Sequence, residues 1–273
     1  MGDKKLSRKE FLVGAGGLIA GALTAGTLSG VFGLSEAKAG TPSLPWPWPR
    51  SGLDVDKVRI RAFEGYQKNG CCYGAAKALL DTLAETAGGP WNTIPPEMFV
   101  FGSGGAVHWG TLCGALNGCL PVMTLATGKE GVSKLGHELM GWYTVFPFPS
   151  ATLDYLTPDY KNQVQTVSKS PLCHNSVSIW CAASGERVKS AARKARCAKL
   201  TGDVAARAAE LLNQWYAGSF TPVFQLDPTT QECISCHVGK ESLLDDAVGS
   251  MTCTECHHPV GPRPAMGSGH KAS

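Results

Sequence analysis

The sequence predicts an all-α protein that consists of an irregular helical domain and a C-terminal segment rich in loops. Apolar residues recur at helical spacing in several windows between residues 54 and 216. No window alternates apolar and polar residues convincingly, so no strand is predicted. After Gly218, five prolines interrupt any long helix. Residues 54–220 are therefore expected to form the helical domain, and residues 221–273 the loop-rich segment.

The expected helices follow one another along the domain. The first runs over residues 54–68 and the second over residues 72–86, where a Gly-Gly-Pro sequence ends it. Thr201 and Asp203 are suitable residues to start the last helix. The remaining apolar segments at helical spacing are 105–126, 131–146, 176–183, 186–199 and 204–216.

Composition and charge limit the class of protein. The chain has 273 residues, of which 43% are hydrophobic and 17% charged, enough for one substantial core. Its net charge is +3, and without residues 1–39 it keeps 20 basic and 19 acidic residues. This balance argues against nucleic acid as a partner.

The N-terminus has the organisation of an export signal. Residues 1–39 contain a basic start, an apolar stretch rich in glycine and alanine, and Ala37-Lys38-Ala39, which has the form of a cleavage site. The run over residues 7–12 resembles a twin-arginine signal with Lys9 in place of the second arginine. An uncut membrane anchor is the alternative, but the apolar stretch is weak for a spanning helix. We expect cleavage, a periplasmic protein without a stable membrane span, and an extended Pro/Trp-rich arm over residues 40–53.

Two pentapeptides near the C-terminus carry the strongest chemical signal. They are Cys233-Ile-Ser-Cys236-His237 and Cys253-Thr-Glu-Cys256-His257. In a C-x-x-C-H motif both cysteines form thioether bonds to a haem, and the histidine binds its iron from one face. The sequence therefore predicts two covalently attached haems c. Only 15 residues separate the motifs, so the haems should be neighbours.

A zinc ribbon is the main alternative for these cysteines. Two CxxC pairs separated by 16 residues also satisfy the spacing of a four-cysteine zinc site. A ribbon does not need the histidine that follows each pair, however, and covalent haem attachment agrees with export. We therefore favour haem over zinc.

Each haem iron needs a second axial ligand or keeps that position open. His258 directly follows His257, an arrangement similar to that of multihaem cytochromes, in which the extra histidine serves a different haem. His108 follows a glycine-rich stretch that would let a bulky ring come close. For His258 the alternative is a solvent-facing or propionate-bonded imidazole. The weaker distal candidates are His270 and His137, and His174 ranks below them because a histidine beside Cys173 could belong to another site.

Seven further cysteines lie in the helical domain: Cys71, Cys72, Cys113, Cys119, Cys173, Cys181 and Cys197. Cys72, the box Cys113-Gly-Ala-Leu-Asn-Gly118, Cys173 and Cys197 resemble the redox-active family that is named for its C-GCAxxG-C-C pattern. With the two haem motifs attached, residues 50–260 resemble the split-Soret cytochromes c.

This resemblance implies a homodimer of mostly helical subunits, each with two stacked bis-histidine haems and an iron-sulfur site in the helical domain. It also implies that a distal ligand can come across the dimer interface. The implied cluster ligands are Cys72, Cys113, Cys173 and Cys197, with Cys119 as a substitute. The alternative is that these cysteines only pack in the core.

Two functions are consistent with these features. The first is an electron carrier with saturated haems that exchanges electrons with redox partner proteins. The second is an oxidoreductase in which a haem iron or the cysteine-bound cluster keeps an open position for a small substrate. The close haem pair and the surplus of histidines favour the carrier. No hydrolytic or nucleotide-binding motif is evident.

Overall fold

The computed structural model describes residues 44–239, 242, 245–246, 248–255 and 257. The predicted signal peptide, Cys256 and the candidate ligands His258 and His270 lie outside these residues. Within the described part the chain forms helices and short 3-10 turns, with two isolated β-bridges and no strand. The predicted all-α fold is thus confirmed. No described helix is both long and apolar enough to cross a membrane.

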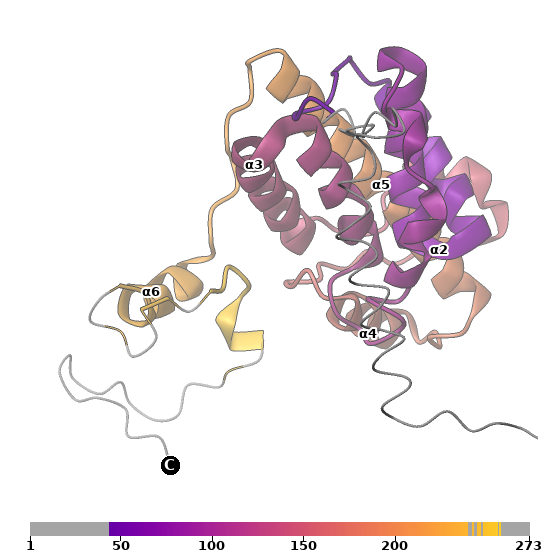
Figure 1. Ribbon diagram of the computed structural model, residues 1–273. Helices are drawn as coiled ribbons and strands as arrows, with labels where there is room; N and C mark the ends of the chain where they lie inside the picture. Colours follow the sequence, from indigo (N-terminus) through magenta and orange to yellow (C-terminus); the bar gives the residue numbers. More distant parts are fainter. Residues whose placement is uncertain (1–43, 240–241, 243–244, 247, 256, 258–273) are drawn as a thin grey trace, which may run out of the picture. The chain divides into compact units, whose positions relative to one another are not determined.

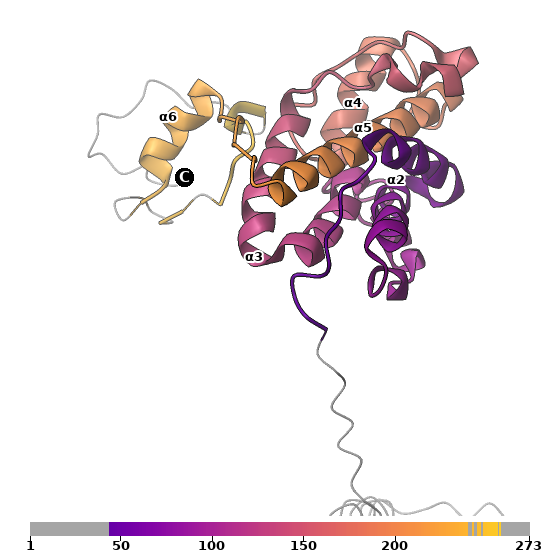
Figure 2. The ribbon, with the colours of Figure 1, turned by 90° about the horizontal axis from the view of Figure 1, so that it is seen from above.

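Three long helices form the body of the helical domain. α2 (Val55–Ala87), α3 (Gly114–Val145) and α5 (Ala191–Tyr216) each pack against the other two, side by side in Figures 1 and 2. α4 (Cys173–Ser184) precedes α5, and α6 (Pro228–His237) belongs to the C-terminal segment. The short 3-10 elements are η1 (Trp91–Thr93), η2 (Pro96–Gly102), η3 (Ala151–Leu156), η4 (Pro158–Tyr160) and η5 (Cys253–Glu255).

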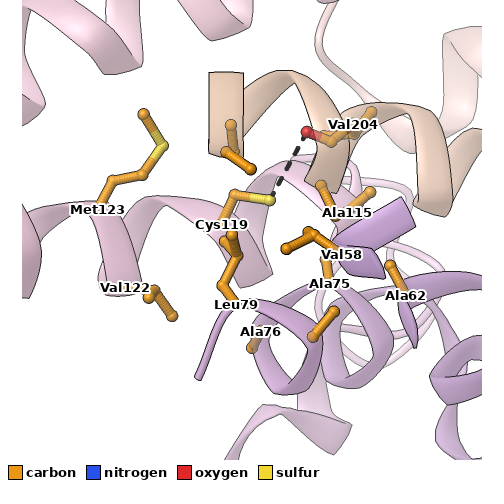
Figure 3. Close-up of a cluster of buried hydrophobic side chains, with 14 of the residues drawn as sticks. Val58, Ala62, Ala75, Ala76, Leu79, Ala115, Cys119, Val122, Met123 and Val204 are labelled. Atoms are coloured by element: carbon orange, nitrogen blue, oxygen red, sulfur yellow. Dashed lines mark hydrogen bonds between the residues drawn. The ribbon is translucent and has the colours of Figure 1, made fainter. Parts of the chain in front are cut away.

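Small and aliphatic side chains fill the core between these helices. Leu79 of α2 and Val122 of α3 are fully buried, and alanines such as Ala76 let the helix backbones approach closely (Figure 3). Burial of one such leucine or valine contributes roughly 1.5–3 kcal/mol. Cys119 lies in the same cluster, with its Sγ 4.0 Å from the carbonyl oxygen of Val204.

A glycine kinks each of the two longest helices. In α2 the kink lies at Asn69 and Gly70, where Gly70 has a φ of +83°, and helical geometry resumes at Cys71. The two halves of α2 correspond to the predicted helices over 54–68 and 72–86. In α3 the kink lies at Gly128, with a φ of +71°.

The structure corrects three expectations about individual elements. Residues 105–113, the first part of the predicted segment 105–126, are not helical, because residues 104–108 and 110 have left-handed backbone geometry. The predicted helices over 186–199 and 204–216 are one helix, α5, which begins at Ala191 and continues through Thr201, whose hydroxyl donates to the Cys197 carbonyl. The loop-rich segment contains α6, because Asp227 caps its N-terminus.

The described part of the Pro/Trp-rich arm packs on the helical domain. The Trp46 indole donates to the Thr124 carbonyl at 3.0 Å, and the Trp48 backbone N–H donates to the Leu125 carbonyl at 2.8 Å. The Trp48 ring also meets Trp91 edge to face, with centroids 4.9 Å apart. The arm from residue 44 onward is therefore held by specific contacts.

Candidate functional site

Four cysteines from four helices line one cavity of about 260 Å³ in the helical domain, which we call the thiol cavity. Cys71 comes from the second half of α2, Cys113 from the start of α3, Cys173 from α4 and Cys197 from α5. The first two are buried and the other two partly exposed. The helical bundle thus gathers four thiols that are far apart in the sequence.

Three of these cysteines lie at helix N-termini. Cys71 is where α2 resumes after its kink, Cys113 is the N-cap of α3, and Cys173 is the first residue of α4. Free backbone N–H groups and the helix dipole make such ends favourable for negative charge. The cavity is therefore suited to thiolates and to an anionic group between them.

The pKa values of these thiols show why a cation is needed for them to ionise. Burial raises the pKa of Cys71 well above its ordinary value, and the neighbouring Cys113 raises it further. Burial also raises the pKa of Cys113, and it raises that of Cys173 to about 12. Bound metal would displace these protons and replace the lost solvation.

The remaining lining of the cavity is basic or neutral. Arg193, Arg196, His108 and His174 contribute, and no aspartate or glutamate is among the described lining residues. His108 and His174 are exposed. Within the described part of the chain, no three His, Cys, Asp or Glu side chains already lie in the arrangement of metal ligands. The donor types and the charge of the lining nevertheless fit an iron centre with thiolate ligands.

The structure separates the cysteines that were predicted as cluster ligands. Cys113, Cys173 and Cys197 line the cavity, whereas Cys72 and Cys119 do not. Successive residues of a helix point about 100° apart, so only one of two adjacent cysteines can face the cavity, and here it is Cys71. This placement favours Cys71 over Cys72 as a ligand, while the ligand set itself stays a prediction. The Asn69-Gly70 pair that precedes Cys71 indicates that a new helical segment begins there. It does not indicate the directions in which the Cys71 and Cys72 side chains point.

His108 is held in an unusual backbone conformation. Residues 104–108 and 110 all have positive φ, and that of His108 is +67°. Val107, a β-branched residue, has a φ of +47°, which is rare for such a side chain. Trp109, the next residue, is 81% exposed. The turn thus presents an imidazole at the rim of the thiol cavity together with exposed apolar groups.

The first haem motif lies on α6. Cys233, Cys236 and His237 occupy positions i, i+3 and i+4, so they share one face of this helix. From residue 221 onward, Thr230 is the one buried side chain among the described residues. The segment therefore has no apolar core of its own in the part that is described, and two haems would supply one.

Hydrogen bonds connect α6 to the second haem motif. The Thr230 hydroxyl accepts from the Cys253 backbone N–H at 3.3 Å, and the Asp227 carboxylate accepts from the Thr252 hydroxyl at 3.3 Å. Burial raises the pKa of Cys233, and the adjacent Cys253 thiol raises it further, so one sulfur from each motif lies beside the other. The two attachment sites are close, as the short linker predicts.

The structure places one other candidate distal ligand. The His137 ring, on α3, packs edge to face against Phe224, with centroids 5.6 Å apart. His137 and His108 both stay predicted distal ligands.

Comparison with known proteins identifies the family. The profile of the redox-active protein family C_GCAxxG_C_C matches residues 73–211. A relative, split-Soret cytochrome c of Desulfovibrio desulfuricans, is 31% identical in a match 268 residues long, and the match covers 92% of this chain and 94% of the relative. This chain belongs to the split-Soret cytochrome c family. The resemblance inferred from the haem motifs and cysteine boxes is confirmed.

A solved structure agrees with this assignment. The structure reported for a novel iron centre in split-Soret cytochrome c from Desulfovibrio desulfuricans ATCC 27774 superposes with a TM-score of 0.72 at 33% identity. The match covers 78% of this chain and 91% of the chain in that structure. As a member of the split-Soret cytochrome c family, the chain is a haem-binding electron-transfer protein.

The Cys113–Gly118 box of this split-Soret family member has a packing role. A Cβ on Gly114 would collide with the Cys71 Sγ, and a Cβ on Gly118 with the Cys72 carbonyl oxygen. Both glycines therefore let α3 approach the segment where α2 resumes. The box places Cys113 beside Cys71 because it contains no larger side chain at either position.

Proposed function

We propose that this chain is a periplasmic electron carrier with two haems c and an additional iron-sulfur centre in the thiol cavity. The observation that carries the proposal is the convergence of Cys71, Cys113, Cys173 and Cys197 on one cavity, in a chain that also has two C-x-x-C-H motifs. When bound, these groups supply one-electron transfer. The protein's own residues hold them, limit their contact with water and neutralise their charge.

The described residues divide these tasks between them. Cys233, Cys236 and Cys253 are the haem attachment points, and His237 and His257 are the proximal ligands. Asp227 and Thr230 keep the two motifs adjacent through the hydrogen bonds described above. In the helical domain, an anionic centre is favoured by the helix N-termini at Cys71, Cys113 and Cys173 and by the positive charges of Arg193 and Arg196.

Metal content and a matched pair of variants test this proposal. Haem, non-haem iron and acid-labile sulfide are measured on the same purified sample, and two haems with stoichiometric iron and sulfide are expected. C71S should lose the non-haem iron, whereas C72S, one residue away, should keep it. Two haems without sulfide would exclude the iron-sulfur centre, and loss of iron from C72S alone would restore the ligand set predicted from the sequence.

Carbon monoxide distinguishes the carrier from the oxidoreductase. The ferrous carrier with two axial histidines on each haem should not bind carbon monoxide. Stoichiometric binding would show an open haem position and would support catalysis on a small substrate. H108A and H137A extend this test, since loss of a distal ligand would make one haem bind the gas.

The proposal includes a homodimer. Exposed apolar side chains gather between residues 98 and 109, namely Met98, Val100, Phe101, Val107 and Trp109. A patch of this kind is typical of a protein interface. Light scattering on the purified protein should give twice the mass of one chain, and a W109E substitution should shift it toward the monomer. Cell fractionation tests the periplasmic location.

A further inference from the structure

Two buried polar groups of the thiol cavity lack hydrogen-bond partners. Arg196 is 1% exposed, and its Nε makes no hydrogen bond. The Tyr143 side chain is fully buried, and its hydroxyl lies beside the Cys113 thiol and the Ser176 hydroxyl without a hydrogen bond of normal geometry to either. A buried donor without a partner costs roughly 1–3 kcal/mol, so such donors are usually satisfied by something bound nearby.

Both terminal nitrogens of the Arg196 guanidinium have polar neighbours. Its Nη2 donates to the Ser176 hydroxyl at 2.9 Å, and Ser176 is itself buried. Its Nη1 lies 3.9 Å from the Cys197 Sγ. The guanidinium is thus anchored on α4 by one nitrogen while another approaches a cavity sulfur.

The lining charge indicates what these donors meet. Arg193, one turn before Cys197, lies next to that thiol and provides a second positive charge. No acidic side chain among the described lining residues compensates either arginine. An anionic group between the four cysteines would satisfy both the charge and the free donors.

We propose that Arg196 and Tyr143 are positioning residues for the iron centre, which donate hydrogen bonds to its sulfur atoms and raise its reduction potential. The inference rests on the proposed iron centre and adds the residues that tune it. Hydrogen bonds and positive charge near the sulfurs stabilise the more negative, reduced state. Ser176 supports this role, because it fixes the orientation of the guanidinium.

A potentiometric titration followed by electron paramagnetic resonance tests the proposal on the full-length haem-loaded protein. R196Q should shift the midpoint potential of the iron centre to a lower value, and R196K, which keeps the charge but not the planar fork, should shift it less. Y143F should give a smaller downward shift. The haem potentials, measured optically in the same samples, should not change. K194Q, on an exposed residue of α5, and Y155F, on an exposed tyrosine, are the controls.

The outcomes separate this inference from the proposed function. Wild-type protein without non-haem iron contradicts the iron centre itself. Iron-containing R196Q and Y143F that titrate at the wild-type potential contradict the tuning role alone and indicate that water satisfies the two donors. If R196Q does not assemble the iron centre, the midpoint potentials of R196K and Y143F decide whether these residues tune it. Loss of iron from both of these would make the residues structural and would equally overturn the proposal.

Discussion

Leu112 and Leu172 form an isolated antiparallel β-bridge, which joins the segments that lead into α3 and α4. The bridge consists of two hydrogen bonds, in which the Cys113 N–H donates to the Pro171 carbonyl at 2.8 Å and the Cys173 N–H donates to the Thr111 carbonyl at 2.7 Å. Two cavity cysteines therefore lie next to each other at the starts of two helices. Backbone pairing, and not side-chain packing alone, sets their separation.

A substitution at Gly110 should damage this arrangement. Gly110 has a φ of +71°, its carbonyl accepts the His174 N–H, and a Cβ there would lie 3.0 Å from the His174 Cβ. G110A should therefore lower both the free energy of unfolding and the non-haem iron content. G185A is the matched control, because Gly185 has a φ of +74° and a Cβ there meets nothing within 4 Å. G185A should cost only about 1–2 kcal/mol of backbone strain and leave the iron content unchanged. Equal losses in the two variants would contradict the importance of the bridge.

The buried ion pair between Lys199 and Asp154 should be a major contributor to stability. The Lys199 side chain is 1% exposed, and its Nζ donates to the Asp154 carboxylate at 2.7 Å. D154A would leave the buried ammonium without its counter-charge, and urea denaturation should show a loss of about 3–5 kcal/mol. D154N keeps an acceptor and should lose less. E130A, which breaks the exposed pair between Glu130 and Lys134, should change stability little.

The same aspartate should make stability depend on pH. Burial by itself would raise the pKa of Asp154, but hydrogen bonds from the Asn162 N–H and from Lys199 lower it below its ordinary value. Because the folded pKa is lowered, the contribution is fully present above the unfolded value of about 3.9 and is lost as the pH falls through the folded value. The stability difference between wild type and D154A should therefore narrow below about pH 4. The measurement should extend to about pH 2, which is about two units below the unfolded pKa of an aspartate. A stability difference between wild type and D154A that stays constant over this range would contradict the lowered pKa of Asp154.

Glu138 should fasten the segment that leads to the haem motifs. Its buried carboxylate accepts the backbone N–H groups of Val223 and Phe224, both at 3.0 Å. E138A removes this acceptor, and limited proteolysis should then cleave faster near residues 218–228. E210A is the control, since Glu210 forms an ion pair with Arg207 of the same helix, α5. Unchanged cleavage in E138A would show that other contacts hold the segment.

Thr230 should couple the two haem motifs. It is buried, and its hydroxyl joins α6 to the Cys253 backbone. T230V should keep both haems attached but change the exciton signal of the haem pair in Soret circular dichroism. T229V, at an exposed neighbour, should leave that signal intact. An identical signal in T230V would mean that the haems themselves set their spacing.

Much of the fold could be predicted from local patterns. The Asn69-Gly70 kink and the Gly-Gly-Pro end of α2 were visible in the sequence, since each depends on backbone preferences of adjacent residues. The continuity of α5 through Thr201 was not visible in the sequence. The buried contacts of α5 with the rest of the domain override the local preference of Thr201 and Asp203 for a helix start. Asp203, expected as a helix start, is buried instead and accepts from Arg59 at 2.8 Å. The helix α6 was missed because Pro228 was taken as a breaker, although proline is favourable in a first turn.

By itself, the sequence determined the chemistry that depends on neighbours along the chain. Two C-x-x-C-H motifs define haem attachment because both cysteines and the histidine lie within five residues. Only the tertiary structure decided which distant side chains share the thiol cavity. Cys71 faces it and Cys72 does not, and the donors of Arg196 and Tyr143 join it from α5 and α3. The reason is physical: the direction of a side chain from a helix depends on how that helix packs, and four helices must pack together before this cavity exists.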